Sequence, residues 1–491
     1  MLNSDIIKQY KVAIGIECHV QLKTTTKLFA SVDNDARDAE PNTLISHICF
    51  GLPGALPVLN EKAVELASKA SFALNSTPAK FSTFDRKHYF YPDLPMGYQI
   101  TQFYHPIVIG GEVTIQLDGK TKAIGITRAH LEADAGKSSH PAGSDYSLVD
   151  LNRAGTPLLE IVSDPDISSP AEARQYAHEL FLLMKYAGVS DADLFHGNMR
   201  FDVNVSVSKT DELGTRTETK NLNSFRSVEK AAQYEINRQI ELLEKGKSID
   251  QETRGWDEAK QKTTSQRGKE HAHDYRYMPD PDIPPIELDD DYIAIIKASM
   301  PLLPGNWRES LKSIGLDATQ TEILIENEVL SDEVNYLDII KQNKADKCLT
   351  KLIANWMVNI EIPLRKETET ELNNNTKQRN TIYLEIAKLY NDKKLSSSNA
   401  KLLLGELLGH NNLPDSIEKY ANEQGLIQVS DSKEIEALVL QVLKDNPKAV
   451  EDIKAGENKV IGYLVGQVMK QSQGKANPGL TRQLIDKLIS K

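Results

Sequence analysis

The sequence of 491 residues contains only three cysteines, Cys18, Cys49 and Cys348, and they lie far apart. Cysteines this few and this widely spaced exclude a disulfide framework and are typical of a reducing compartment. No apolar run approaches the roughly 18 residues of a membrane-spanning helix. The first residues, MLNSDIIKQYKVAIGIE, lack the patterns of signal and transit peptides. We therefore expect a cytoplasmic protein that does not bind a membrane.

An excess of basic residues is also missing, since the formal net charge is -12 at pH 7. This charge excludes a simple basic nucleic-acid coat, although a local basic patch could still bind RNA. Hydrophobic residues make up 40% and charged residues 26% of the chain, which is ordinary for globular proteins. The composition therefore indicates a globular protein without a dominant charge-driven partner.

Two common binding motifs are incomplete. Residues 136–138 read GKS, but Leu131 stands where a phosphate-binding P-loop needs its first glycine, so we exclude a P-loop. Ser46 and Cys49 have the spacing of a C-x2-C pair, but only one of them is a cysteine. Because a zinc site needs more ligands than this, we predict no structural zinc.

The pattern of apolar residues changes near residue 296. Before it, short β-type runs alternate with a few helices, and after it the patterns are helical. Two early helices are clearly marked: Ser169 and Ser224 are candidate caps, and Gly188 and Gly246 are candidate ends. The chain is too long for one core. We therefore predict the α+β class, with a sheet-containing front half and an all-α rear half.

The stretch GIECHVQL, residues 14–21, places two polar side chains in an apolar strand. Alternate residues of a strand share a face, so Glu17 and His19 point the same way. Glu160 lies similarly between apolar residues in PLLEIVSDPD. A carboxylate in such a strand must be paired or bind a metal. Two alternatives stay open here, a site for Mg²⁺ or Mn²⁺ and a buried Glu–His hydrogen bond.

The stretch RFDVNVSVS alternates apolar residues with Arg200, Asp202 and Asn204. After a turn, the segment TRTETKNLNS alternates again and carries Lys220, so the two read as an antiparallel hairpin with a polar face. Such a face suits phosphate and metal binding. The alternative is an ordinary solvated sheet face.

Residues 84–103, FDRKHYFYPDLPMGYQITQF, read as β-structure in which cations such as Lys87 stand among aromatic residues. Aromatic rings interleaved with cations can bind nucleotide bases and phosphates. An aromatic core strand with charged ends is the other interpretation.

Long motifs then follow one another in an order known from one family: GIECHVQLKTTTKLF, GLPGALPVLN, FDRKHYFYPDLPMGYQITQ, HLEADAGK, DLNRAGTPLLEIVSDPD, GNMRFDVNVSV, KNLNSFRSVEKA, DYRYMPDPDIPP and GKANP. From about residue 11 to its end, the chain resembles the B subunits of aspartyl/glutamyl-tRNA(Asn/Gln) amidotransferases, the GatB family. The resemblance implies a cradle-like kinase domain on an antiparallel sheet over 1–295, a helical domain over 296–415 and a tRNA-binding helical tail over 416–491.

The resemblance also implies an activity. The B subunit uses ATP and Mg²⁺ to phosphorylate the side-chain carboxylate of misacylated Glu-tRNA(Gln) or Asp-tRNA(Asn). An amidase A subunit frees ammonia from glutamine, which displaces the phosphate, and a small C subunit completes a heterotrimer. The implied metal ligands are Glu17, His19 and Glu160; we further expect catalytic roles for Lys87, Asp202 and Asn204 and contacts with ATP from Arg200 and Lys220.

One residue departs from the family pattern. HLEADAGK has Ala133 where the family usually carries a second glutamate, which the resemblance implies to be a metal ligand. Glu132 and Asp134 are expected to face away from that position on a strand. This departure keeps open a second function, a non-catalytic tRNA-binding scaffold of the same complex. A metal-dependent phosphotransferase unconnected to tRNA is the third.

Overall fold

The structure is a computed structural model that describes residues 4–489, except for 142, 269–274, 331–333, 368–371, 411, 429–431, 455–456, 458, 473–475 and 477. The chain forms two compact units, Met1–Pro304 and Gly305–Lys491. The first unit contains the sheets and the second is largely helical, so the predicted α+β class is confirmed. The three predicted domains, with boundaries at 295 and 415, stay a prediction.

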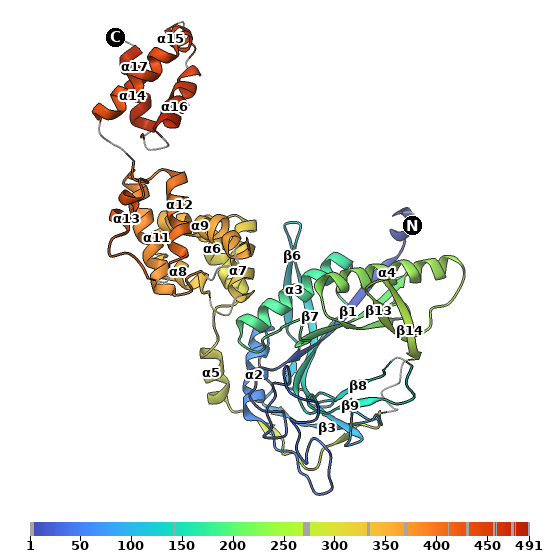
Figure 1. The fold of residues 1–491 in the computed structure, drawn as a ribbon. Helices are drawn as coiled ribbons and strands as arrows, with labels where there is room; N and C mark the ends of the chain where they lie inside the picture. The colour runs from blue at the N-terminus through green and yellow to red at the C-terminus, as the bar shows by residue number, and fades with distance from the viewer. Residues whose placement is uncertain are drawn as a thin grey trace. The chain divides into compact units, whose positions relative to one another are not determined.

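The first unit is built on one large sheet of nine strands among the described residues (Figure 1). Its strands pair in the order β14-β13-β12-β11-β1-β10-β7-β5, and β6 adds to β7. Their bounds are β1 Lys11–Gln21, β5 Val108–Ile109, β6 Glu112–Leu117, β7 Lys120–Ala133, β10 Pro157–Ser163, β11 Met199–Ser208, β12 Thr217–Leu222, β13 Glu252–Asp257 and β14 Lys262–Gly268. The strand β1 is central, with β10 on one side and β11 on the other.

The predicted hairpin and antiparallel sheet are found, with one exception. The strands β11 and β12 pair antiparallel, with a register shift between Phe201 and Val203. The strands β12 and β13 pair parallel, because helix α4 (Phe225–Glu244) carries the chain back between them. Parallel neighbours need such a crossover.

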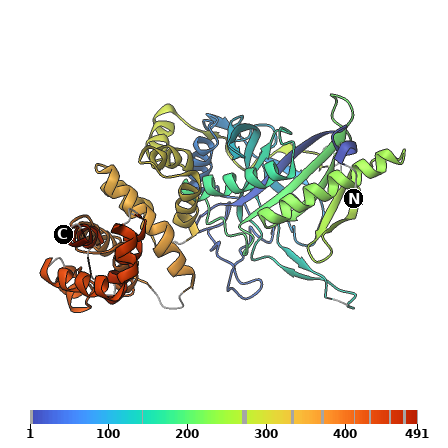
Figure 2. The same cartoon turned by 90° about the horizontal axis from the view of Figure 1, so that it is seen from above.

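Two long helices cover one face of this sheet. Helix α3 (Pro170–Tyr186) packs beside α4, and both contact the sheet. In the view from above, the two green helices lie side by side across the strands (Figure 2). The predicted caps are present, since Ser169 accepts a hydrogen bond from Glu172 N and Ser224 accepts one from Ser227 N. The helices therefore fill one face and leave the other for the polar residues.

Shorter elements complete the first unit. Three small sheets pair β2 (Phe81–Ser82) with β16 (Ile286–Glu287), β3 (Asp85–His88) with β4 (Tyr98–Thr101) and β15 (Met278–Pro279), and β8 (Lys137–Ser139) with β9 (Leu148–Asp150). The remaining helices are α1 (Ser4–Ile7), α2 (Glu61–Ala73) and α5 (Asp290–Ala298). The open face of the large sheet looks toward β3, β8 and β9 (Figure 1).

The reading of residues 84–103 as continuous β-structure is wrong in its middle. The strand β3 ends at His88, and β4 begins at Tyr98. Between them the chain turns through Pro92 and Pro95, which have no N–H for a ladder. Gly97 then adopts φ +70°, which favours glycine. Lys87 nevertheless remains on a strand.

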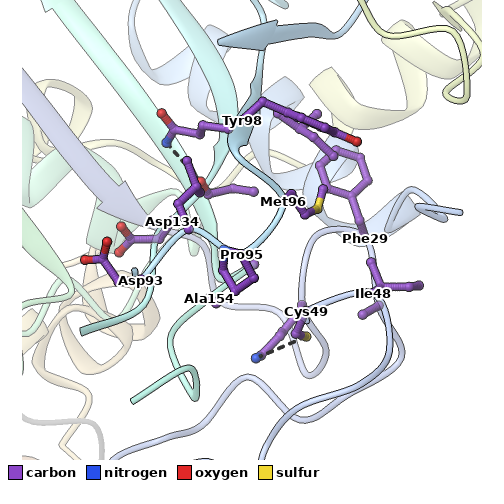
Figure 3. Close-up of a pocket in the computed structure, with 16 residues that line it drawn as sticks. Phe29, Ile48, Cys49, Asp93, Pro95, Met96, Tyr98, Asp134 and Ala154 are labelled. Atoms are coloured by element: carbon purple, nitrogen blue, oxygen red, sulfur yellow. Dashed lines mark hydrogen bonds between the residues drawn. The ribbon is translucent and has the colours of Figure 1, made fainter. Parts of the chain in front are cut away.

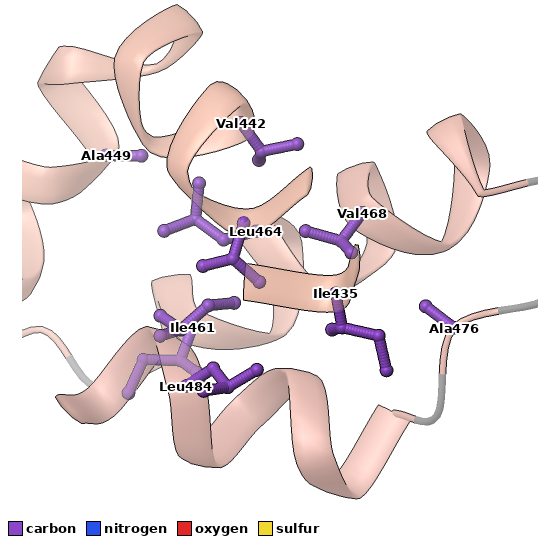
Figure 4. Packing of buried hydrophobic residues seen from close by; sticks show 10 residues of the cluster. Ile435, Val442, Ala449, Ile461, Leu464, Val468, Ala476 and Leu484 are labelled. Carbon is purple, nitrogen blue, oxygen red and sulfur yellow. The ribbon is translucent and has the colours of Figure 1, made fainter. Parts of the chain in front are cut away.

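The second unit consists of helices over its described residues: α6 (Pro304–Ser313), α7 (Ala318–Leu330), α8 (Tyr336–Asn343), α9 (Lys347–Trp356), the π-helical turn η2 (Met357–Glu361), α10 (Ile362–Glu367), α11 (Thr376–Asn391), α12 (Ser397–Leu408), α13 (Ile417–Glu423), α14 (Ser432–Asp445), α15 (Pro447–Lys454), α16 (Val460–Gln471) and α17 (Pro478–Ile489). The last four share their own core, in which Ile435, Leu464 and Leu484 point toward one another (Figure 4). In the described parts of the chain, no helix is both long and apolar enough to cross a membrane.

Candidate functional site

Polar side chains from six strands of the large sheet gather in one cleft of about 460 Å³. Its lining includes Glu17, His19, Lys87, Glu132, Asp134, Glu160, Arg200, Asp202, Glu218 and Lys220. The strand register explains this gathering: Glu17 stands opposite Asp202, and His19 stands opposite Glu160 on one side and Arg200 on the other. Opposed residues of antiparallel strands lie close together on one face. The sheet therefore joins residues that are far apart in the sequence.

A first group of possible ligands consists of His19, Glu132 and Glu160, whose ligand atoms lie within 4.8 Å of one another. His19 Nε2 is 3.5 Å from Glu160 Oε2 and 3.6 Å from Glu132 Oε1. Behind them, the Nε2 of the buried His130 lies 3.5 Å from Glu160 Oε2. Two carboxylates thus converge on one imidazole in a largely buried setting.

The electrostatics of this group show crowded negative charge. Burial and then the charge of Glu160 raise the pKa of Glu132 to about 7. Burial alone would lower the pKa of His19, but its hydrogen bond with Glu160 and the nearby carboxylates outweigh burial and raise this pKa to about 9. Burial lowers the pKa of His130 to about 4. A bound cation would relieve the repulsion between the carboxylates.

A second group consists of Glu17, Asp202 and Glu218, again with ligand atoms within 4.8 Å of one another. Burial and the neighbouring carboxylates raise the pKa of Glu17. Asn204 Nδ2 donates a hydrogen bond of 3.0 Å to Glu17 Oε1 and so orients that carboxylate. Lys220 Nζ lies 3.0 Å from Asp202 Oδ2 and 3.3 Å from Glu218 Oε1. This group is therefore partly neutralised by one lysine.

Cations surround both groups. Arg200 Nη2 lies 3.2 Å from Asp134 Oδ2, and Arg153 Nε lies 3.4 Å from the same oxygen. Lys87 Nζ lies 4.9 Å from the ring centre of Tyr275, and no carboxylate of the described residues comes within 4.0 Å of it. The cleft thus offers one ammonium group that forms no ion pair with the described residues and could meet an anionic ligand.

The structure brings most of the predicted residues together. Glu17, His19, Lys87, Glu160, Arg200, Asp202 and Lys220 all line the cleft. Asn204 lines an adjoining cavity of about 450 Å³ and reaches the cleft through its bond to Glu17. Their roles as metal ligands, catalytic residues and ATP contacts stay predictions.

Sequence reasoning missed Glu132, Asp134 and Glu218 as parts of this cleft. The expectation that Glu132 faces away from position 133 agrees with the structure. The expectation that position 133 faces the metal site is wrong, because Glu132 joins His19 and Glu160 in the cleft and Ala133 does not. Glu132 pairs with Leu158, which stands two positions before Glu160. This pairing places Glu132 beside the apolar strand that carries Glu160. Glu218 stood in the predicted polar hairpin, but its register with Asn204 could not be read from the sequence.

Ala133 lies outside both carboxylate groups. It lines a separate apolar cavity of about 50 Å³, together with Phe29, Met96 and Ile100. Figure 3 shows this cavity, with Phe29 and Met96 facing each other across it. Alternation along β7 explains the placement, since Glu132 points to the cleft and its neighbour points the other way. A missing acid at position 133 therefore leaves no gap in the first group.

Replacing Ala133 by glutamate is expected to leave Mn²⁺ binding unchanged, because the new carboxylate would enter the apolar cavity. The matched control, Glu132→Gln, should weaken Mn²⁺ binding by at least roughly tenfold, since it removes a possible ligand. Titration calorimetry with both variants distinguishes the two positions. Tighter binding by Ala133→Glu would contradict the placement of Ala133 in the apolar cavity.

Comparisons with known proteins identify the family to which the chain belongs. Residues 12–294 match the family model described as the GatB/GatE catalytic domain, and residues 335–489 match the GatB domain model. The chain is 43% identical over 489 residues to the B subunit of the aspartyl/glutamyl-tRNA(Asn/Gln) amidotransferase of Carboxydothermus hydrogenoformans, covering 98% of this chain and 99% of that protein.

Proteins of the same name from other organisms are equally similar. The one from Caldanaerobacter subterraneus is 44% identical over 486 residues, which is 98% of this chain and all (100%) of that protein. The one from Thermotoga maritima is 42% identical over 488 residues, or 98% of this chain and 99% of that protein. These matches confirm the resemblance that the motifs indicated. The chain belongs to the family of aspartyl/glutamyl-tRNA(Asn/Gln) amidotransferase B subunits.

Proposed function

We propose that the cleft is the kinase site of a tRNA-dependent amidotransferase, where ATP phosphorylates the side-chain carboxylate of misacylated Glu-tRNA(Gln) or Asp-tRNA(Asn). The observation that carries this proposal is that two clusters of carboxylate residues lie beside cations in one cleft. A carboxylate is a poor electrophile, and phosphorylation converts its oxygen into a good leaving group. Ammonia can then replace the phosphate and complete the amide.

The residues of the cleft fit Mg²⁺. Carboxylate oxygens, with one imidazole, are donors that hard divalent ions accept, and each group can supply three ligand atoms. His19, Glu132 and Glu160 would hold one ion, and Glu17, Asp202 and Glu218 a second. When bound, Mg²⁺ would neutralise the phosphates and stabilise the charge of the transfer.

The cations of the cleft would bind the phosphates and the substrate. Arg200 and Lys220 are each held in place by a carboxylate, at 3.2 Å from Asp134 and 3.0 Å from Asp202. We assign them to the phosphate oxygens of ATP. Lys87, which has no such partner among the described residues, would bind the carboxylate that is phosphorylated and hold it near the first group.

Asp202 and Asn204 would act in different ways. Asp202 can bind the second metal ion and also positions Lys220. Asn204 donates to Glu17 and does not line the cleft itself, so it is a positioning residue in this proposal. Its Oδ1 has no protein partner among the described residues, although the atom is buried.

The two alternative functions, a tRNA-binding scaffold and a phosphotransferase unconnected to tRNA, are less well supported. The scaffold hypothesis depended on a gap at Ala133, and Glu132 completes the carboxylate group without that position. An unrelated phosphotransferase does not agree with family models that match both units. The kinase proposal is therefore the one that the residues of the cleft favour.

The relatives are named as subunits, so they form one part of a larger enzyme. We propose that this chain works in the cytoplasm as a heterotrimer with an amidase A subunit and a small C subunit. In this proposal the helical unit and its tail bind tRNA(Gln) or tRNA(Asn). Ammonia reaches the phosphorylated carboxylate from the A subunit.

Release of phosphate from ATP tests the proposal directly. The chain, purified with its A and C partners, should release phosphate only when Mg²⁺ and Glu-tRNA(Gln) or Asp-tRNA(Asn) are both present. Correctly charged Gln-tRNA(Gln) is the matched control and should give none. Tight tRNA binding without any phosphate release would instead establish a scaffold.

A further inference from the structure

A buried lysine and a buried cysteine meet at the end of the apolar cavity that Ala133 lines. Lys27 is 1% exposed, and its Nζ donates hydrogen bonds of 2.6 Å to Leu44 O and 3.4 Å to Leu151 O. The same nitrogen lies 3.5 Å from Cys49 Sγ. Neither residue belongs to the cleft described above. The proposed kinase reaction leaves both of them unused.

The charge of this lysine is not balanced by a carboxylate. In the described part of the chain, no carboxylate oxygen lies within 4.0 Å of Lys27 Nζ, and Asp150 acts on it only from farther away. Burial lowers the pKa of Lys27. The Cys49 sulfur is the side-chain atom that contacts this nitrogen, so the amine is held directly beside the thiol. A thiolate beside a lysine is the reactive form of cysteine.

The sulfur also faces open space. Cys49 is 8% exposed and lines the cavity of about 50 Å³. Figure 3 shows Cys49 at one end of the cavity, with a dashed line to the lysine nitrogen. A volume of about 10–15 Å³ already holds one water molecule. The cavity therefore has room for hydrogen peroxide, which is only slightly larger than water.

Two described side chains lie within hydrogen-bond distance of this sulfur, those of Lys27 and Ser46. The other cysteines are Cys18, buried in β1, and Cys348, exposed in α9 of the other unit. Ser46 Oγ lies 3.5 Å from Cys49 Sγ, but a hydroxyl is a poorer nucleophile than an amine. The nucleophile placed to trap an oxidised Cys49 is therefore Lys27.

We propose that Lys27 and Cys49 form a covalent sulfur–nitrogen cross-link when the protein meets hydrogen peroxide. The Cys49 sulfur first attacks peroxide and the O–O bond breaks; the departing hydroxide takes the thiol proton and leaves as one water, so that the sulfur becomes a sulfenic acid. The amine lone pair then attacks sulfur, an S–N bond forms, and the hydroxyl leaves with an amine proton as a second water. Sulfur is oxidised by two electrons, and one peroxide is reduced to two waters.

The lysine can reach the sulfur without a change of the fold. Its four-carbon stem is flexible, so the nitrogen can close the gap by rotation of side-chain bonds. The product would tie the loop around Cys49 to the segment that follows β1. Gln99 and Asp134 line both this cavity and the proposed kinase cleft, so the cross-link would form next to that cleft.

Mass spectrometry of the full chain, with and without hydrogen peroxide, tests the proposal. The expected product has lost two hydrogen atoms, and its digest contains a peptide pair joined through Lys27 and Cys49. Dithiothreitol should restore the original mass. Trypsin does not cut after a modified lysine. Peroxide should therefore abolish cleavage at Lys27, and dithiothreitol should restore it.

Matched variants assign the chemistry. Cys348→Ser should still form the cross-link, whereas Cys49→Ser should not. Lys27→Arg keeps a cation but offers no nucleophilic amine, so its Cys49 should instead react with dimedone as a sulfenic acid. If Lys27→Arg does not fold, the digest of the natural chain decides alone. Peroxide-treated natural protein in which Cys49 is unmodified, or carries two added oxygens beside a free Lys27, would overturn the proposal.

Discussion

Glu160→Gln is expected to lower Mg²⁺-dependent release of phosphate from ATP by at least roughly 10²-fold, the effect of removing one group that stabilises transferred charge. Glu160 Oε2 lies 3.5 Å from both His19 Nε2 and His130 Nε2 and is the centre of the first carboxylate group. Glutamine keeps the shape of the side chain but loses its charge. The variant should therefore lose activity while its fold and tRNA binding remain.

Glu65→Gln on α2 is the matched control for this experiment. Glu65 is also a half-buried carboxylate of the first unit, but it pairs with Lys62 and Lys69 on a helix outside the cleft. Its replacement should leave phosphate release unchanged. Full activity of Glu160→Gln would remove Glu160 from the catalytic site and leave its contact with His19 as a structural hydrogen bond.

Glu361→Gln is expected to destabilise the second unit by about 3–5 kcal/mol, the usual effect of leaving a buried charge without its partner. Glu361 and Arg379 are both fully buried, with Arg379 Nε 2.9 Å from Glu361 Oε1 and Nη2 3.0 Å from Oε2. Arg365 and the Tyr383 hydroxyl bind the same carboxylate. Without the charge of Glu361, the buried guanidinium of Arg379 has no compensation.

Urea unfolding followed by tryptophan fluorescence measures this effect, because Trp356 stacks on Tyr383 with ring centres 6.5 Å apart. The double variant Glu361→Gln with Arg379→Met should recover much of the lost stability, since it removes the uncompensated charge. A double variant less stable than Glu361→Gln would contradict this account.

The ion pair between Glu361 and Arg379 makes the stability of the second unit depend on pH in a defined direction. Burial alone would raise the pKa of Glu361, but the charge of Arg379 outweighs burial and holds this pKa below its ordinary value of 4.5. The stabilisation is therefore complete above pH 4.5 and is lost as pH falls through the lowered pKa. The difference in unfolding free energy between the natural chain and Glu361→Gln should shrink in acid.

Local sequence patterns predicted the helix caps and the faces on which side chains lie along a single strand. The caps at Ser169 and Ser224 mark helices because a side-chain oxygen must satisfy the first free N–H groups. Alternation placed Glu17 and His19 on one face, since side chains of a strand point to opposite sides in turn. Assigning a residue to a face in this way needs only the strand itself.

The missed features depend on pairing between distant segments. The side of β7 that faces the metal site was assigned from Ala133, whereas Glu132 is the residue that faces it. An error of one position exchanges the two faces of a strand. Glu218 meets Glu17 through two strand pairings, one of which carries a register shift. No local pattern records that shift. The motifs identified the family, but the structure was needed to show which carboxylates converge.

The central place of β1 has a consequence for synthesis of the chain. Residues 11–21 leave the ribosome well before their neighbours in the sheet, which are residues 157–163 and 199–208. At about 5–20 residues per second, the last of these partners follows roughly 10–40 s later. Both edges of β1 are unpaired until β10 follows, and one edge stays unpaired until β11 follows, so the carboxylates cannot yet converge. The proposed catalytic cleft is thus a late product of translation, and the nascent chain needs protection from aggregation before it exists.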